Sequence, residues 1–261
     1  MLTDIRVRRL DTLVNLILDR AEEEWKGTMV KTALLEKSLS EMAESNIPGH
    51  SFLGPNNYVS DNFIAMMVDM RDSTEHLRRA ISGRTARASQ MERVFYEISA
   101  LLPAVARIVK DEKGAVTEYL GDGALALFQA TKDPAKWPEA IYSSHGASEN
   151  CIDALHKVIN PTLAKRYGLP PIEIGVGLAF SEAVVTRFGL PPNTEVKVIG
   201  ECVYFASELS KGRNEIIVDG VLERAWPTSD SGRIRFRTKK YGRKNDIDGY
   251  ILGYKDQSQA A

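Results

Sequence analysis

The stretch Phe63-Ile64-Ala65-Met66-Met67-Val68-Asp69 decides the fold and the chemistry of this chain. Six consecutive apolar residues have the length of a β-strand in a sheet that is covered on one side or both. The run stops at a carboxylate, so the sequence predicts an acidic side chain at the end of a buried strand.

A second carboxylate, Asp122, lies in the Gly-Asp-Gly turn between the apolar runs Val116–Leu120 and Ala124–Phe128. These runs predict a β-hairpin. Two carboxylates side by side repel each other unless cations lie between them, and such a pair is typical of a two-metal phosphoryl-transfer site. Taken singly, Asp122 is also an ordinary turn residue, and Asp69 is also a strand-end residue capping the next helix.

The composition indicates a cytoplasmic protein with a sizeable core. Of 261 residues, 43% are hydrophobic, and 34 Lys and Arg residues face 35 Asp and Glu residues. This balance disfavours a nucleic-acid binder, which would carry a basic excess. We expect neither a signal peptide nor a membrane span, because no window of about 18 apolar residues exists. Cys151 and Cys202 form no CxxC pair, and the histidines show no HExxH spacing, so no zinc site is expected.

The chain divides into a helical N-terminal part and an α+β core. Residues 1–45 carry leucines at helical spacing, and Gly, Pro and Asn follow over residues 45–57. We therefore predict an N-terminal helical extension and linker over residues 1–58, and a core domain over residues 59–256.

The predicted core is a ferredoxin-like βαββαβ sheet, an α/β sandwich with helices on one face and a C-terminal β-hairpin. A capping box at Asp72 and Glu75 would start a helix that Gly83 interrupts. The further predicted helices cover residues 95–108, 147–166 and 200–211. The further predicted strands cover residues 172–180, 183–188, 195–199, 215–218, 233–238 and 250–254.

Three segments, in this order, resemble class III nucleotidyl cyclase catalytic domains. Phe63–Thr74 is similar to their first metal motif, and Glu118–Phe128 to their second, a Gly-Asp hairpin. Gly175–Gly189, followed by Val198–Leu209, resembles their third block, a strand and protruding arm before a helix. The ordered set is more specific than any single segment.

The resemblance implies a homodimer with active sites at the subunit interface. Its substrate would be a nucleoside triphosphate, converted to a 3′,5′-cyclic monophosphate and pyrophosphate. Asp69 and Asp122 would hold two Mg²⁺ or Mn²⁺ ions per active site, with the Met70 carbonyl as a further ligand. The helix start at Asp72-Ser73-Thr74 would offer backbone N–H groups to the phosphates.

Two positions that would read the base are unusual. Glu118 lies where related adenylyl cyclases carry Lys and guanylyl cyclases carry Glu, and Lys197 lies where many relatives carry Asp, Thr or Cys. A carboxylate accepts from N–H groups and an ammonium donates, so the pair suits the imide edge of uracil or guanine, and cytosine is possible. The alternative is a plain ion pair between the two side chains.

The pattern departs from the family where phosphate charge is stabilised. The family's transition-state Asn and Arg correspond to Tyr204 and Glu208, and a frequent Arg corresponds to Glu173. Losing such a cation can lower the rate by orders of magnitude. Other cations that could substitute are Arg71, Arg187, Arg213 and the basic cluster Lys239–Lys244.

Lys239 and Lys240 lie where relatives carry a triphosphate-binding Lys in a C-terminal hairpin. The basic cluster over residues 239–244, which begins with these two lysines, can equally be interpreted as a solvated basic turn.

Intact metal carboxylates beside a divergent base pocket indicate a changed substrate. The chain resembles the stand-alone pyrimidine cyclases of the Pycsar antiphage system, which make cyclic UMP or cyclic CMP in bacteria. Tyr204 could fill the space of a purine or stack on a smaller base. We favour a uridylate cyclase, then a cytidylate cyclase, then an adenylyl or guanylyl cyclase. Alternatives are a silent cyclase-like dimerisation or nucleotide-sensing module and a subunit that needs a different partner chain.

Overall fold

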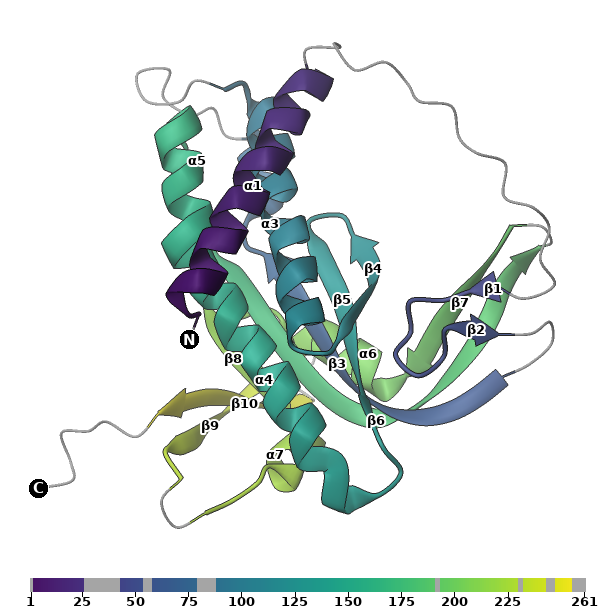
Figure 1. Cartoon of the computed structure of the whole chain (residues 1–261). Helices are drawn as coiled ribbons and strands as arrows, with labels where there is room; N and C mark the ends of the chain where they lie inside the picture. The colour runs from purple at the N-terminus through teal and green to yellow at the C-terminus, as the bar shows by residue number, and fades with distance from the viewer. Residues whose placement is uncertain are drawn as a thin grey trace, which may run out of the picture.

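A computed structural model describes residues 2–25, 43–53, 58–78, 88–190, 193–229, 232–242 and 247–254. Within these ranges the chain alternates between helices and strands (Figure 1). The helices are α1 (Asp4–Trp25), α2 (Ser73–Arg78), α3 (Gln90–Asp111), η1 (Pro134–Lys136), α4 (Trp137–Ala154), η2 (Leu155–Ile159), α5 (Asn160–Tyr167), α6 (Glu201–Leu209) and α7 (Gly220–Ala225). The strands are β1 (Ala43–Glu44), β2 (Phe52–Leu53), β3 (Tyr58–Met70), β4 (Ala115–Leu120), β5 (Gly123–Ala130), β6 (Ile174–Leu190), β7 (Asn193–Gly200), β8 (Glu215–Asp219), β9 (Ile234–Tyr241) and β10 (Ile247–Tyr254).

One mixed sheet organises the molecule. Its strand order is β4-β5-β3-β6-β8-β10-β9, and β7 pairs with the outer half of β6. All neighbours are antiparallel except β6 and β8, which are parallel. This arrangement puts β3, which contains the apolar run 63–68, between β5 and β6, and it places the β4–β5 turn beside the end of β3.

Helices cover both faces of the sheet, not one face as predicted. The long helices α1, α3 and α4 lie over one face, which we call the helical face (Figure 1). Cys202 and Ala206 of α6 instead pack with Phe63 and Met67 on the opposite face, which we call the α6 face. The α6 helix packs closely there because glycine residues of β6 leave room for it. The predicted order of helices and strands does not indicate which face such a helix covers.

The helix α1 belongs to the main core. Leu10, Val14 and Leu18 are buried in the same cluster as Met66 of β3 and Leu101 of α3. The predicted helical pattern continues beyond Trp25, but residues 26–42 lie outside the described residues, as does Gly83. Residues 43–44, predicted to be helical, instead form β1, which pairs with β2 of the predicted linker in a short two-stranded sheet.

Two predicted element boundaries were wrong. The strands expected over residues 172–180 and 183–188 form one strand, β6, because Ser181 and Glu182 keep pairing with β3. The helix expected over residues 147–166 begins at Trp137 and continues through the π-helical turn η2 into α5. Pro138 stands near its start, where proline is favoured, although it was not used as a start signal.

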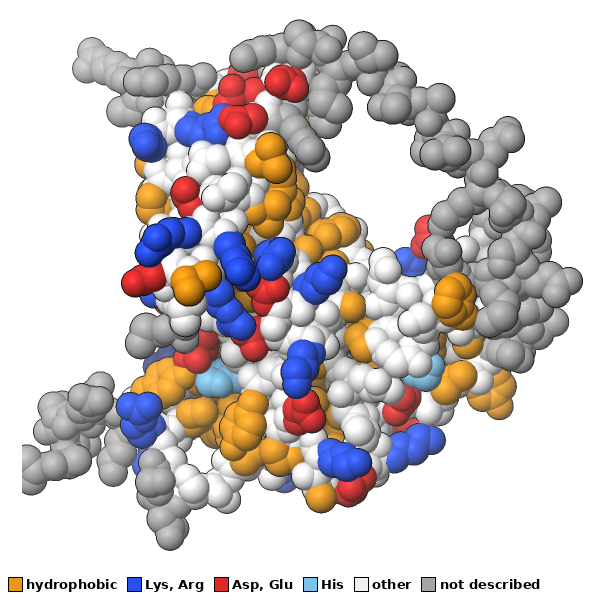
Figure 2. All heavy atoms as spheres, in the orientation of Figure 1, with side chains coloured by type: hydrophobic (Ala, Val, Ile, Leu, Met, Phe, Trp, Pro, Cys, Tyr) orange, Lys and Arg blue, Asp and Glu red, His pale blue; other side chains and the backbone are white. Residues whose placement is uncertain are grey.

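Charge and hydropathy on the surface match the balanced composition. On the face shown in Figure 2, acidic and basic side chains lie intermixed among exposed hydrophobic ones. No helix within the described residues is long and apolar enough to cross a bilayer.

We predict that Gly177→Ala lowers the free energy of unfolding by about 1–3 kcal/mol. The added methyl group would lie 2.0 Å from the backbone oxygen of Ala206, which only a displacement of α6 can relieve. Gly253→Ala is the matched control in β10, because its methyl group meets no atom within 4 Å. Urea denaturation monitored by circular dichroism measures both, and equal stability of the two variants would contradict the close packing of α6 on β6.

Candidate active site

The two predicted metal carboxylates converge at the end of β3. Asp69 pairs in register with Gly123, the first residue of β5, and Asp122 immediately precedes it in the turn. Gly121 opens this turn with a φ of 67°, a backbone conformation that favours glycine. A Cβ atom on Gly123 would lie 3.3 Å from Asp69 Oδ1, so the absence of a side chain leaves room for the carboxylate.

Asp69 points to the α6 face. Side chains alternate along a strand, and the odd-numbered neighbours Phe63, Ala65 and Met67 pack on that face. Met70 is buried in the core of the helical face, so only its backbone is available at the site.

The donor set suits a hard divalent ion. Carboxylate and carbonyl oxygens are the ligands that Mg²⁺ and Mn²⁺ prefer. Within the described part of the chain, no group of three or more His, Cys, Asp and Glu side chains is arranged to hold a metal. The candidate site therefore consists of Asp69, Asp122 and the backbone at Met70.

Arg71 adds a positive charge directly at the carboxylates. Its guanidinium forms an ion pair with Asp69, and its buried Nε has no hydrogen-bond partner among the described residues. Burial lowers the pKa of Arg71, and Arg213 acts in the same direction, whereas Asp122 and Asp72 oppose the shift. The guanidinium thus lies within the electrostatic reach of both predicted metal carboxylates.

The predicted phosphate loop follows at once. The helix α2 begins at Ser73, as predicted, and the Asp72 carbonyl accepts from the His76 N–H group. The Asp72 carboxylate pairs with Arg213 at 2.6 Å, and this hydrogen bond lowers the pKa of Asp72. Asp72 adopts a φ of 57°, which non-glycine residues rarely do. Thr74 is exposed in the first turn of α2.

Arg213 joins this loop to the strand that follows α5. Besides Asp72, it binds Glu173 at 2.5 Å, just before β6. Glu173, which was predicted to lie where class III cyclases often carry Arg, is therefore paired with a cation.

A buried ionic network that the sequence analysis missed holds α2 in place. Glu97 of α3 is fully buried and accepts from Arg93 Nε at 2.8 Å and from His76 Nδ1 at 2.8 Å. Arg93 and Glu97 are four residues apart, a spacing typical of helical ion pairs, and this was the available signal. The capping box that does start α3 is formed by Ser89 and Glu92.

The two predicted base-reading residues are brought together. Lys197 Nζ of β7 lies 3.4 Å from Glu118 Oε2 of β4 and 3.1 Å from Glu195 Oε2. Burial would lower the pKa of Lys197, but the two carboxylates raise it overall. Glu118 pairs in register with Leu125, a residue of the α6 face, so it shares that face with Asp69. The ion pair that was the alternative interpretation is therefore present.

Tyr204 and Glu208, which were predicted to correspond to the transition-state residues, lie on α6. Tyr204 is 59% exposed, and its ring lies 5.5 Å from that of Phe205. Glu208 pairs with Lys211 at 2.5 Å. Tyr204 is thus available to a ligand or a partner, whereas Glu208 is engaged within α6 and the turn after it.

Lys239 and Lys240 are not brought to the carboxylates within one chain. They lie on β9, the edge strand four places from β3. Lys240 pairs with Asp248 at 2.5 Å, and Lys239 Nζ lies 5.4 Å from the centre of the Tyr241 ring. The rest of the predicted basic cluster, Arg243 and Lys244, lies outside the described residues.

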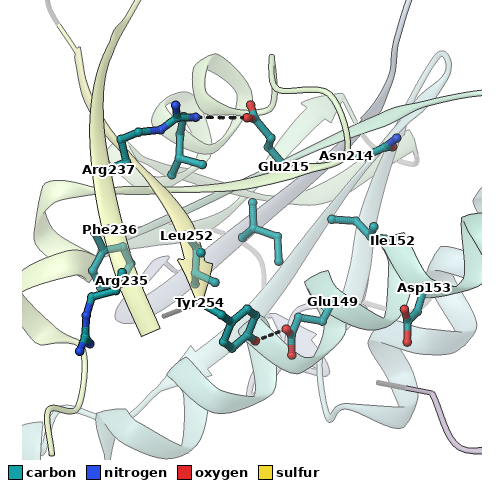
Figure 3. A pocket seen from close by; sticks show the side chains of 13 residues that line it. Glu149, Ile152, Asp153, Asn214, Glu215, Arg235, Phe236, Arg237, Leu252 and Tyr254 are labelled. Atoms are coloured by element: carbon teal, nitrogen blue, oxygen red, sulfur yellow. Dashed lines mark hydrogen bonds and ion pairs between the residues drawn. The ribbon is translucent and has the colours of Figure 1, made fainter. Parts of the chain in front are cut away.

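A cavity of about 510 Å³ lies elsewhere, on the helical face between α4 and the strands β8 to β10. Figure 3 shows Tyr254 directed toward Glu149 and Arg237 directed toward Glu215 at its wall. None of the predicted site residues lines this cavity.

We predict that Glu97→Ala lowers the free energy of unfolding by about 3–5 kcal/mol, because it leaves Arg93 as a buried unpaired charge. Glu139→Ala is the control, since it removes an exposed ion pair with Lys113 and should change stability little. Chemical denaturation of both variants tests this. Similar losses for the two would show that the Glu97 network does not stabilise the fold.

The sequence matches no protein-family model and no curated protein. The structure, however, is similar to solved nucleotidyl cyclase domains. The guanylyl cyclase Cya2 has a TM-score of 0.61 and 19% identity, over 77% of this chain and 96% of Cya2. The adenylyl cyclase CyaB from P. aeruginosa has a TM-score of 0.61 and 16% identity, over 77% of this chain and 98% of CyaB.

The guanylate cyclase domain of RhGC from Catenaria anguillulae, solved in complex with GTP, has a TM-score of 0.54 and 14% identity, over 76% of this chain and all 100% of that domain. At such identities the likeness establishes the fold alone. The predicted fold class is confirmed: the chain has the α+β fold of class III nucleotidyl cyclase domains.

Proposed function

We propose that this protein is a nucleotidyl cyclase that converts a nucleoside triphosphate into a 3′,5′-cyclic nucleotide and pyrophosphate. The observation that carries the proposal is the register of β3 and β5, which aligns Asp69 with Gly123 and so sets Asp122 beside it. The fold of adenylyl and guanylyl cyclases around this pair supports the same chemistry.

In the proposed reaction the 3′-oxygen attacks the α-phosphorus, its proton leaves, and the bond to pyrophosphate breaks. Asp69, Asp122 and the Met70 carbonyl would hold two Mg²⁺ or Mn²⁺ ions. Bound ions of this kind lower the pKa of the hydroxyl and neutralise charge on the leaving group. The backbone N–H groups at Asp72-Ser73-Thr74 would bind phosphate oxygens.

A head-to-tail homodimer would complete each active site. One subunit would supply the carboxylates, and its partner would supply the base contacts from Glu118, Lys197 and Tyr204 and phosphate contacts from Lys239 and Lys240. The exposed ring of Tyr204 on the α6 face supports such an interface. The division into an extension over residues 1–58 and a cyclase domain over residues 59–256 belongs to this proposal.

We favour UTP as the substrate, then CTP, then the purine nucleotides. The adjacent Glu118 and Lys197 offer one acceptor and one donor on the same edge, which suits the imide of uracil. Together with the resemblance to pyrimidine cyclases, this supports a cytoplasmic role in bacterial antiphage defence.

A catalytically silent dimerisation or nucleotide-sensing module is the second candidate. The observations that favour it are Tyr204 and Glu208 at the transition-state positions and the ion pair that engages Lys197. Incubation of the purified protein with each of the four nucleoside triphosphates and Mn²⁺, followed by chromatography, separates the two. One cyclic product names the substrate, and no product from any of the four favours the silent module.

We predict that Asp69→Asn and Asp122→Asn each lower turnover by at least about 100-fold, because each removes a charged metal ligand. Both variants should keep the fold and the oligomeric state, measured by circular dichroism and light scattering. Retained turnover in either variant would reject the metal role of that residue.

We predict that Glu118→Lys changes the preference among the four nucleotides by at least about tenfold, because it replaces an acceptor by a donor at the base. Competition assays with mixed nucleotides measure this ratio. Glu139→Lys, an equal charge change at an exposed position, is the control. An unchanged ratio in Glu118→Lys would show that this residue does not read the base.

A further inference from the structure

Among the cations that could replace the family's missing arginine, Arg71 alone contacts a predicted metal carboxylate within the described part of the chain. Arg187 donates to Thr194 at 2.6 Å on the β6–β7 hairpin. Arg213 pairs with Asp72 and Glu173, and the two lysines of β9 lie at the far edge of the sheet.

The position of Arg71 follows from the chain geometry. Asp69 and Arg71 are two residues apart at the end of a strand, so their side chains emerge on the same side. The Arg71 side chain is only 16% exposed, compared with 32% for Asp69, and no described residue forms a hydrogen bond with its buried Nε. The guanidinium therefore lies against the Asp69 carboxylate, and the described residues leave its Nε–H group unused.

We propose that Arg71 competes with divalent cations for Asp69, and that the triphosphate of the substrate ends this competition by drawing the guanidinium onto its own oxygens. The inference rests on the proposed function and deepens it, since it assigns Arg71 as the phosphate-binding cation of the site. Arg71 then both restrains the metal site before the substrate binds and contacts the substrate afterwards.

Charge and shape support both halves of this role. A divalent ion that enters beside a fixed guanidinium is repelled, most strongly where the surroundings are partly buried. Phosphate oxygens, like carboxylate oxygens, match the planar fork of an arginine and carry more negative charge. Metal ions and nucleotide would accordingly bind cooperatively, each raising the affinity of the other by the same factor.

The test measures Mn²⁺ binding without nucleotide, by electron paramagnetic resonance of the free ion, so it does not depend on turnover. Arg71→Met should bind Mn²⁺ about tenfold more tightly than the wild type, because the competing charge is gone while the length of the side chain is kept. Adding a 3′-deoxynucleoside triphosphate, which cannot cyclise, should tighten Mn²⁺ binding in the wild type much more than in Arg71→Met.

Three further variants make the result specific. Arg213→Met removes a neighbouring charge that does not touch Asp69, and its Mn²⁺ affinity should stay within about twofold of the wild type. Asp69→Asn added to Arg71→Met should abolish the tight binding. Arg71→Lys keeps the charge but not the planar guanidinium, so its Mn²⁺ affinity should lie between those of the wild type and Arg71→Met. This variant replaces Arg71→Met in the test if the methionine variant does not fold.

The inference would be overturned if folded Arg71→Met bound Mn²⁺ no more tightly than the wild type. It would also be overturned if Arg213→Met raised the Mn²⁺ affinity as much as Arg71→Met does. Either result would leave the metal role of Asp69 intact. Absence of Mn²⁺ binding that depends on Asp69, in every variant and with nucleotide present, would overturn the proposed function and the inference together.

Discussion

The backbone pairing of β3 with β5 is the constraint on which the candidate site depends. It sets Asp69 opposite Gly123 and therefore beside the turn that carries Asp122. A slip by one residue would move Asp69 to the helical face, because side chains alternate along a strand. The buried side chains of both faces hold the register, since Met66 and Met67 fill different cores on opposite sides of the sheet.

Around this pairing, the molecule balances a dense group of charges. Asp69 is paired with Arg71, and Asp72 and Glu173 are paired with Arg213. Such pairs stabilise little where they are exposed, but they keep two cations beside the loop that is proposed to bind the triphosphate. The fully buried Glu97 binds His76 of α2 and so fixes the helix that follows the loop with these charges.

Most strands of the main sheet and the convergence of the two carboxylates could be predicted, because local patterns indicate them: an apolar run, a Gly-Asp-Gly turn and alternation. The crossing of α6 over the second face could not, since it depends on the backbone of Gly175 and Gly177 meeting a helix far along the chain. The Glu97 network was missed for a related reason. A buried ion pair and a solvated one have the same spacing in sequence, and only tertiary packing separates them.

In the proposed function, the choice between uracil and cytosine would depend on the order of donors and acceptors along the edge of the base, and not on their number. Uracil presents a carbonyl and then a ring N–H group, whereas cytosine presents an amine and then a bare ring nitrogen. Each base thus offers one donor and one acceptor to Glu118 and Lys197. In the proposed function Lys197 would meet the base while it also pairs with Glu195, whose Oε2 lies 3.1 Å from its Nζ. If Lys197 bound the carbonyl of the base in that function, Glu118 would accept from the adjacent donor, which is the ring N–H group of uracil.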